Sequence, residues 1–385
     1  MATPVLPANG ANRIRLAVSL FYFGQGIAFS SWASRIPDIK QSLHLSDALF
    51  GSILFALPLG QLFTMPVSGR LVTKYGSQKI LTAAAPCYVF ALVFLGFSSS
   101  AWHLVLSLFL FGVIGNMCNI SVNTQGIEAE KMFEKPIMST FHGVWSLAGF
   151  TGALIGLAMI NLNLSPVIHF EIVTAMICIN VLLNYKYLVQ GKSAAGSSGS
   201  FFVRPEKTLF QLGLIGFCSM SAEGAMFDWS GIYFKDIVNA PASLVVLGYA
   251  SFMIMMALGR FAGDKIITKI GRKRTVQYSG LTVFTGMSIS VLFPQLIPAT
   301  LGFMLVGLGV SCIVPTVYSA AGKNKKVSPG MALAMVASVS YFGFLMGPPL
   351  IGYISEMLNL RYSYAIIGCF GLLVAVLSAK IKALD

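Results

Sequence analysis

Charged residues are scarce in this chain, and their scarcity argues against a soluble fold. Asp, Glu, Lys and Arg make up 10% of the 385 residues, against about 25% in a typical soluble domain. Hydrophobic residues make up 56%, and they come in runs of roughly 20, the length that a helix needs to cross a bilayer. We therefore expect an all-α integral membrane protein.

Motifs for ATP binding, metal binding and covalent catalysis are also lacking. The Walker pattern GxxxxGK[ST] does not occur, and the six cysteines lie singly in apolar stretches without a CxxC pair. The four histidines show no metal-ligand spacing. The polar opening segment holds no apolar core with a cleavage site, so we expect no removable signal peptide. We expect no enzyme activity, no cofactor and no bound metal.

Hydropathy predicts twelve membrane-spanning helices. Hydrocarbon cannot satisfy backbone N–H and C=O groups, and every apolar run is too long for a barrel strand. The predicted spans are 14–34, 48–68, 79–98, 102–127, 137–160, 165–188, 207–233, 242–262, 275–294, 296–320, 330–354 and 361–380.

Basic residues predict the orientation of these spans, because cytoplasmic loops are enriched in Lys and Arg. If both termini are cytoplasmic, all but four of the 26 basic residues fall on the cytoplasmic side. The four exceptions are Arg35, Lys40, Lys235 and Arg361. The net charge of +13 is then a topology signal, and we expect no nucleic-acid partner.

A Gly/Ser-rich linker lies at the midpoint of the chain, over residues 190–206. It predicts two six-helix bundles, one over residues 1–189 and one over residues 207–385.

The two predicted bundles also resemble each other in sequence. Residues 71–76 (LVTKYG) match residues 266–271 (IITKIG), 195 positions later, and the same offset carries Gly112 onto Gly307. A duplicated half predicts a pseudo-two-fold structure whose working site lies between the halves, near the bilayer midplane.

With this duplication and the segment 69–79 (GRLVTKYGSQK), the chain resembles the major facilitator superfamily over its full length. The segment is similar to the superfamily's cytoplasmic loop after its second helix, although Thr73 stands where an acid is usual. The residues that match this loop motif, in both copies, are Gly69, Arg70, Lys74, Gly76, Arg260, Lys269, Gly271 and Arg272.

Shorter segments, among them Trp32–Arg35, Gly259–Phe261 and Gly347–Leu350, are similar to the bacterial YbjJ-like branch, which is related to the fucose permease group. This resemblance implies a single-chain, proton-coupled secondary transporter in the bacterial inner membrane.

Glu223 is the predicted proton-coupling residue. It lies near the middle of span 7, where an ionisable side chain costs several kcal/mol and is a functional candidate by default. A carboxyl at that depth readily takes up and releases a proton near neutral pH. The alternative is a permanently neutral carboxyl that holds helices together. His142 in span 5 is a second candidate, either as a proton relay or as a structural histidine.

Arg35 and Asp228 form a predicted outer gate. They lie near the outer ends of spans 1 and 7, which are symmetry mates, so that they would pair when the gate closes. The alternative is that Arg35 reaches lipid headgroups and Asp228 faces water. His169 and Glu171 of the peripheral span 6 are expected to reach the surface in the same way.

The predicted substrate site centres on an amide face of span 4. Asn116, Asn119 and Asn123 share one side of the helix, and Gln125 follows at its cytoplasmic end. Amides both donate and accept hydrogen bonds, which suits a polyhydroxylated or amide-bearing solute; the alternative is hydrogen bonding between helices. The remaining predicted substrate residues are Gln25, Trp32, Trp145, Trp229 and Tyr341.

Three functions agree with these features. The leading hypothesis is a monomeric, proton-coupled symporter that carries a small hydrophilic solute, with a sugar or sugar derivative favoured, by alternating access. The second is a proton-driven exporter of amphipathic compounds or drugs. The third is a non-transporting membrane receptor or scaffold.

Overall fold

The computed structural model describes residues 8–133, 137–190, 206–324 and 329–384, and these residues form helices and short connections with no strand. Within these ranges ten helical segments are long and apolar enough to cross a membrane. Helices α1 (Ala8–Ser42) and α10 (Arg272–Leu292) occupy the two remaining predicted spans. The all-α membrane class is confirmed, whereas residues 191–205 of the predicted linker lie outside the described residues.

The described chain divides into two compact units. Unit 1 comprises Met1–Leu43 and Ala56–Gly196, and unit 2 comprises His44–Phe55 and Ser197–Asp385. Besides α1, unit 1 contains α3 (Ala56–Tyr75), α4 (Ser77–Gly96), α5 (Ala101–Glu130), α6 (Met138–Asn161), α7 (Pro166–Asn184) and the 3-10 helix η1 (Tyr185–Tyr187). Besides α10, unit 2 contains α2 (Asp47–Leu54), α8 (Lys207–Asp236), η2 (Ala242–Leu244), α9 (Leu247–Ile270), α11 (Leu296–Ala321), α12 (Pro329–Met357), α13 (Leu360–Lys380) and η3 (Lys382–Leu384).

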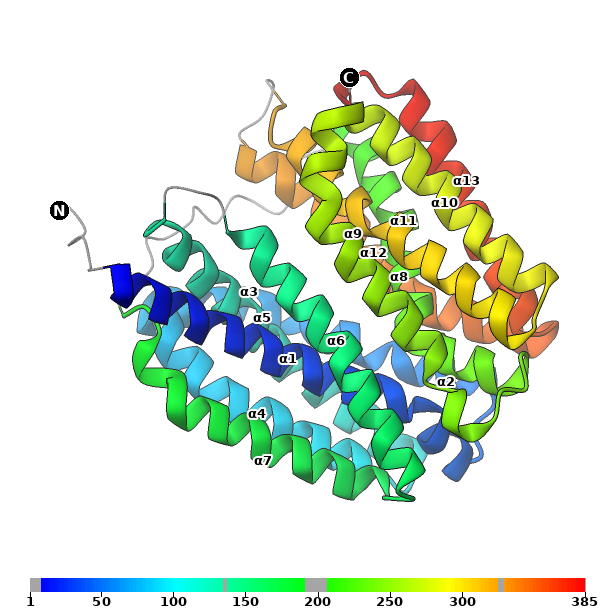
Figure 1. Ribbon diagram of the computed structural model, residues 1–385, viewed down its shortest axis with the longest axis horizontal. Helices are drawn as coiled ribbons and strands as arrows, with labels where there is room; N and C mark the ends of the chain where they lie inside the picture. Colours follow the sequence, from blue (N-terminus) through cyan, green and yellow to red (C-terminus); the bar gives the residue numbers. More distant parts are fainter. Residues whose placement is uncertain (1–7, 134–136, 191–205, 325–328, 385) are drawn as a thin grey trace. The chain divides into compact units, whose positions relative to one another are not determined.

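Corresponding helices pack on each other in the same way in each unit. In unit 1, α1 lies along α6, α3 along α5 and α4 along α7; in unit 2, α8 lies along α12, α9 along α11 and α10 along α13 (Figure 1). The chain order of these helices repeats, so the internal duplication read from the sequence is also a duplication of the packing.

Glycine positions show the same repeat at the level of single contacts. A Cβ added to Gly112 of α5 would overlap the carbonyl oxygen of Leu57, and one added to Gly307 of α11 would overlap that of Phe252. Both residues of the second pair lie 195 positions after those of the first. Small residues let membrane helices approach closely enough for van der Waals packing to hold them.

The turns at Gly76 and Gly271 are a second structural match, again 195 positions apart. Both glycines have positive φ, 91° and 82°, a conformation that only glycine adopts without strain. Each is a single residue between two helices, α3 and α4 or α9 and α10. The predicted loop 69–79 is therefore wrong in extent: Gly69, Arg70 and Lys74 lie in α3, and Arg260 and Lys269 lie in α9.

The second predicted span, 48–68, lies in the stretch Asp47–Tyr75, in which Phe55, itself in a helical conformation, stands between α2 (Asp47–Leu54) and α3. Its first part, α2, packs on α12 in unit 2, whereas its second part, α3, belongs to unit 1. Gly51 and Gly352 bring the backbones of α2 and α12 together, since a Cβ on Gly51 would lie 2.6 Å from the oxygen of Pro348. The hydroxyl of Ser355 donates to Asp47, and the amide of Ala48 donates to Glu356 over 3.2 Å.

The close helix crossings predict unequal costs for glycine substitutions. Gly112→Ala and Gly307→Ala should each destabilise the protein by about 1–3 kcal/mol, because the new methyl group meets rigid backbone. Gly69→Ala is the matched control, since no atom lies within 4 Å of its added Cβ. Thermal unfolding in detergent measures the difference, and equal melting temperatures for all three variants would contradict it.

Candidate functional site

Glu223 on α8 is buried in unit 2 and forms an ion pair there. It is 6% exposed, and its Oε1 lies 3.8 Å from Nη2 of Arg260 on α9. At this separation the two charges attract without a direct hydrogen bond. Arg260, predicted as part of a cytoplasmic loop, instead lies ten positions before the end of α9 at Ile270. The motif match assigns Arg260 to a loop, whereas the residue lies within the helix, as the predicted span 242–262 already implies.

Two further side chains near Glu223 come from other helices, Tyr318 from α11 and, through it, Ser340 from α12. Tyr318 lies within electrostatic range of Glu223, and its hydroxyl hydrogen-bonds with the side chain of Ser340. Ser340 is itself fully buried and donates to the carbonyl of Val336 over 2.7 Å. The carboxyl is therefore surrounded by one cation and one phenol hydroxyl that come from different helices of the same unit.

Three of the predicted unit 1 residues gather around Tyr22 of α1. The Tyr22 hydroxyl donates to Oδ1 of Asn123 over 2.8 Å, and Nδ2 of Asn123 donates to Oδ1 of Asn119 over 2.6 Å. The Tyr22 ring meets His142 edge-on, with 5.7 Å between ring centroids. Asn119 and His142 are exposed, so this polar cluster is open on one side.

Sequence reasoning missed Tyr22, although a signal was present. Tyr22 lies three residues before Gln25 on the same helix, a spacing that places both on one face. A lone tyrosine in an apolar helix is easily left out when the polar residues of span 1 are sought among amides and charged groups.

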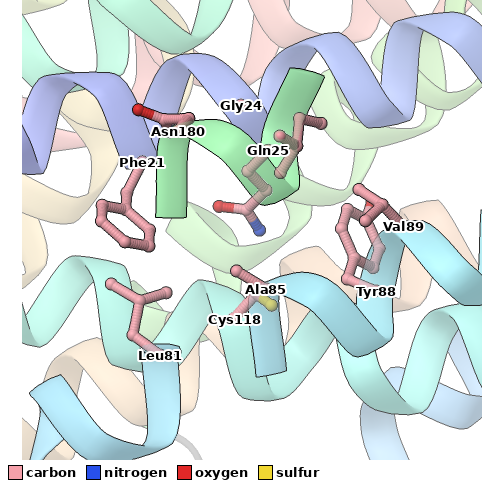
Figure 2. Close-up of a pocket in the computed structure, with 10 residues that line it drawn as sticks. Phe21, Gly24, Gln25, Leu81, Ala85, Tyr88, Val89, Cys118 and Asn180 are labelled. Atoms are coloured by element: carbon pink, nitrogen blue, oxygen red, sulfur yellow. The ribbon is translucent and has the colours of Figure 1, made fainter. Parts of the chain in front are cut away.

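Asn116 and Gln25 lie away from the Tyr22 cluster. Asn116 is 4% exposed, and its Oδ1 accepts no hydrogen bond within the described residues. Gln25 lines a small pocket of unit 1 together with Cys118 and Asn180 (Figure 2). The space inside admits about one water molecule, so this pocket is too small for a solute.

Arg35 is held inside unit 1 in this structure. Its guanidinium donates to Asp38 over 2.8 Å, to the carbonyl of Leu164 over 2.7 Å and to Nδ1 of His169 over 3.3 Å. Arg35 is 3% exposed and His169 is fully buried. The expectation that His169 reaches the surface is wrong, because its ring serves as an acceptor for Arg35. The pairing of Arg35 with Asp228 remains a prediction.

The predicted aromatic residues differ in burial. Trp32 and Trp229 are fully buried, and neither indole N–H has a partner within the described residues. Trp229 meets Phe50 of α2 edge-on at 5.7 Å between ring centroids. Trp145 and Tyr341 are half-buried. In this conformation only the latter two have surface to offer a solute.

The Gln125 side chain is held by hydrogen bonds within unit 1 and does not face a cavity. Its Nε2 donates to Ser77 Oγ and to the carbonyl of Val189, both over 2.8 Å, and its Oε1 accepts the amide of Val189 at 2.7 Å. The side chain is fully buried. These bonds tie the residue at the start of the linker to α5 and to the beginning of α4, which leaves no amide proton of Gln125 for a solute.

The remaining motif residues are basic side chains at helix ends. Arg70, Lys74 and Lys269 are exposed and Arg272 is half-buried. Among the described residues no three His, Cys, Asp or Glu side chains are grouped closely enough to hold a metal ion.

Comparisons with known proteins agree with this architecture. The family model described as Major Facilitator Superfamily matches residues 16–329. An uncharacterized transporter of Sinorhizobium fredii, y4wD, is 33% identical over 93% of this chain and 95% of its own length. An uncharacterized MFS-type transporter of Yersinia pestis is 30% identical over 96% of this chain and 95% of its own.

Solved structures show the same fold at much lower identity. The crystal structure of a mutant of the nucleoside transporter NupG superposes with a TM-score of 0.76, at 13% identity, over 96% of this chain and 100% of that one.

The Gln125 bonds predict a local effect. Gln125→Leu should leave the partly buried amide of Val189 without its acceptor, at a cost of about 1 kcal/mol, and should speed hydrogen exchange in the 185–189 segment roughly fivefold. Thr124→Val is the control, because the Thr124 hydroxyl donates within its own helix, to Ile120. Unchanged hydrogen exchange in Gln125→Leu would show that the Gln125 hydrogen bonds contribute little to the stability of this segment.

Proposed function

This chain belongs to the Major Facilitator Superfamily, and from that premise we propose that it carries a small hydrophilic solute across the bacterial inner membrane together with protons. The coarse function, a multi-pass membrane transporter, follows from the family and from its transporter relatives. The proton coupling, the solute class, the inner-membrane location and the cytoplasmic termini are our proposals.

The ion pair of Glu223 and Arg260 is the observation that carries the proposed proton coupling. Charges inside a membrane protein are costly and are kept where function requires them. The duplication gives a comparison within the chain: 195 positions earlier stand Ala28 and Met65, which cannot form such a pair. Helix packing alone therefore does not require the pair, since the other unit packs without it.

The proposed coupling step is the loss of this ion pair. When Glu223 is ionised, it balances the charge of Arg260 at 3.8 Å. When it takes up a proton, the attraction ends and the local charge rises by one. The two states of unit 2 then differ in electrostatics, which is the differential interaction that a conformational change needs.

The open polar cluster of Tyr22, Asn119 and Asn123 supports a polyhydroxylated solute. Amide and hydroxyl groups match the donors and acceptors of a sugar, and the cluster contains no permanent charge. A sugar or sugar derivative is the favoured solute, in keeping with the proposed kinship to the YbjJ-like branch and the fucose permease group. NupG is a nucleoside transporter by its description, and a nucleoside is itself a sugar derivative.

The assignment of α2 to unit 2 and of α3 to unit 1 suits the proposed alternating access. Helix α2 packs on α12 through Gly51 and Gly352, whereas α3, the next helix along the chain, belongs to unit 1. A hinge at the junction between α2 and α3 would let the two helices follow different units when the transporter changes conformation. With the proposed orientation, α2 is the outer end of its span.

Transport driven by a pH gradient is the principal test. Thermal-shift screening of neutral monosaccharides, polyols, amino sugars, sugar acids and nucleosides first finds a binding solute, because a ligand stabilises the folded state. In proteoliposomes the wild type should accumulate that solute when the outside is acidic. Glu223→Gln should abolish accumulation but retain solute exchange, because an amide cannot carry the proton.

Glu171→Gln is the control for this experiment, since Glu171 is an exposed carboxylate on α7. Normal accumulation by Glu223→Gln would refute the proposed role. Drug efflux from whole cells without uptake of any screened solute would favour the exporter hypothesis instead.

The polar cluster predicts which asparagines bind the solute. Asn119→Ala and Asn123→Ala should each weaken solute binding roughly fivefold to thirtyfold, for a loss of about 1–2 kcal/mol. Asn184→Ala is a matched control, because Asn184 bonds Asn180 one turn earlier, with the same geometry as Asn123 and Asn119. Solute affinity is measured by the concentration dependence of the thermal shift. Equal affinity in all three variants would contradict the proposal that the polar cluster binds the solute.

A further inference from the structure

Asp228 is a membrane-embedded carboxyl that the proposed coupling step does not use. It lies on α8, five positions after Glu223, between the buried residues Phe227 and Trp229. Within the described residues it makes no ion pair and accepts no hydrogen bond, in contrast to Glu223. The residue is only partly exposed, so protein covers most of its surface.

The hydrogen-bond donors Tyr364 and Arg361 of α13, and Tyr233 of α8, already donate to backbone carbonyls. Tyr364, which lies within electrostatic range of Asp228, donates its hydroxyl to the carbonyl of Ala225 over 3.1 Å. The hydroxyl of Tyr233 donates to the carbonyl of Ser290 over 2.8 Å. Arg361 directs two guanidinium nitrogens at the carbonyl of Val291, at 3.1 and 2.6 Å. Each of these groups therefore already satisfies a backbone carbonyl.

Among the described residues, the other helices packed on α8 also place no cation within ion-pair distance of Asp228. Arg260 of α9 is the ion-pair partner of Glu223, and Tyr318 of α11 bonds Ser340. On α12, Glu356 accepts the amide of Ala48, and the Tyr353 hydroxyl accepts the hydroxyl of Ser52. Asp228 thus has the Tyr364 phenol within electrostatic range, and no described side chain forms an ion pair or a hydrogen bond with it.

This environment disfavours the ionised carboxyl. A carboxylate withdrawn from water without a cation or donors costs several kcal/mol, and such a group becomes neutral by taking up a proton. The two carboxyls of α8 therefore differ: Glu223 faces a guanidinium that stabilises its charge, whereas no cation of the described residues forms an ion pair with Asp228. Helix α8 then carries two carboxyls in the same conformation, one ionised and one neutral.

We propose that Asp228 is a second proton-binding residue of the transporter, protonated in the conformation described while Glu223 is ionised. The proton leaves the carboxyl to water as H⁺ when a conformational change hydrates Asp228, and the carboxylate takes up a proton from water on the other side. This inference rests on the proposed proton-coupled function and adds to it a second carboxyl on the same helix.

Infrared difference spectroscopy of the whole protein in lipid, comparing the wild type with its variants, tests the charge state of Asp228 without any solute. A protonated carboxyl gives a C=O stretch that a carboxylate lacks. At neutral pH the wild type should show this band, Asp228→Asn should lose it, and Glu223→Gln and the exposed control Glu171→Gln should retain it. Asp228→Glu keeps a carboxyl at the position and should give a shifted band, which guards against misfolding of the Asn variant. An unchanged band in Asp228→Asn, or no band in the wild type, overturns the proposal.

Transport then separates this inference from the proposed function. With the solute found by the screen, Asp228→Asn should lose accumulation under a pH gradient at least about tenfold and retain exchange. If the wild type accumulates the solute under the gradient and Asp228→Asn does so equally well, this inference fails alone. If the wild type shows no gradient-driven uptake, the proposed function fails with it, whereas the infrared band still reports the protonation of Asp228.

Discussion

The close approach of helix backbones at small residues is the constraint on which this structure depends. Lipid gives helices no hydrophobic reason to associate, so van der Waals contact between them must hold the fold. Gly112 against Leu57 and Gly307 against Phe252 are the same contact made twice, once in each unit. The duplicated chain thus keeps two copies of one packing scheme, and the positions between the contacts are open to diverge.

The charges show where that divergence has occurred. Unit 1 places its buried cation, Arg35, where Asp38, His169 and a backbone carbonyl satisfy it. Unit 2 places Arg260 against Glu223 in the middle of its helices and leaves Asp228 without a partner among the described residues. Unit 1 in turn exposes uncharged amides beside Tyr22. The two halves share a scaffold, but unit 2 carries Glu223 and Asp228 on α8, whereas unit 1 carries the amides, Tyr22 and His142 of the polar cluster.

Prediction from sequence succeeded for the helices and the repeat and was less successful for contacts. Span positions follow from hydropathy because each helix must bury its own backbone polar groups. Arg260 is assigned to a loop by its match to the loop motif, although it lies within α9, which continues to Ile270. Arg35 is expected to pair with Asp228 or to reach headgroups, and His169 to reach the surface, because nothing in the sequence indicates that α1 and α7 place them side by side. Gln125 is grouped with the substrate amides because its helix face alone does not reveal Val189.

The sequence by itself determined the membrane class, the helical spans and the duplication, since these depend on the composition of short segments and on similarity at a fixed offset. Only the tertiary structure decided which polar side chains are partners: Glu223 with Arg260, Arg35 with His169, Tyr22 with Asn123. The physical reason is that a polar group in a membrane is satisfied by whichever donor or charge lies within a few ångströms, and residues that far apart in the chain are brought together only by helix packing. The division of the second span between the units belongs to the same class, because the apolar run continues through Phe55 and only packing on α12 assigns α2 to unit 2.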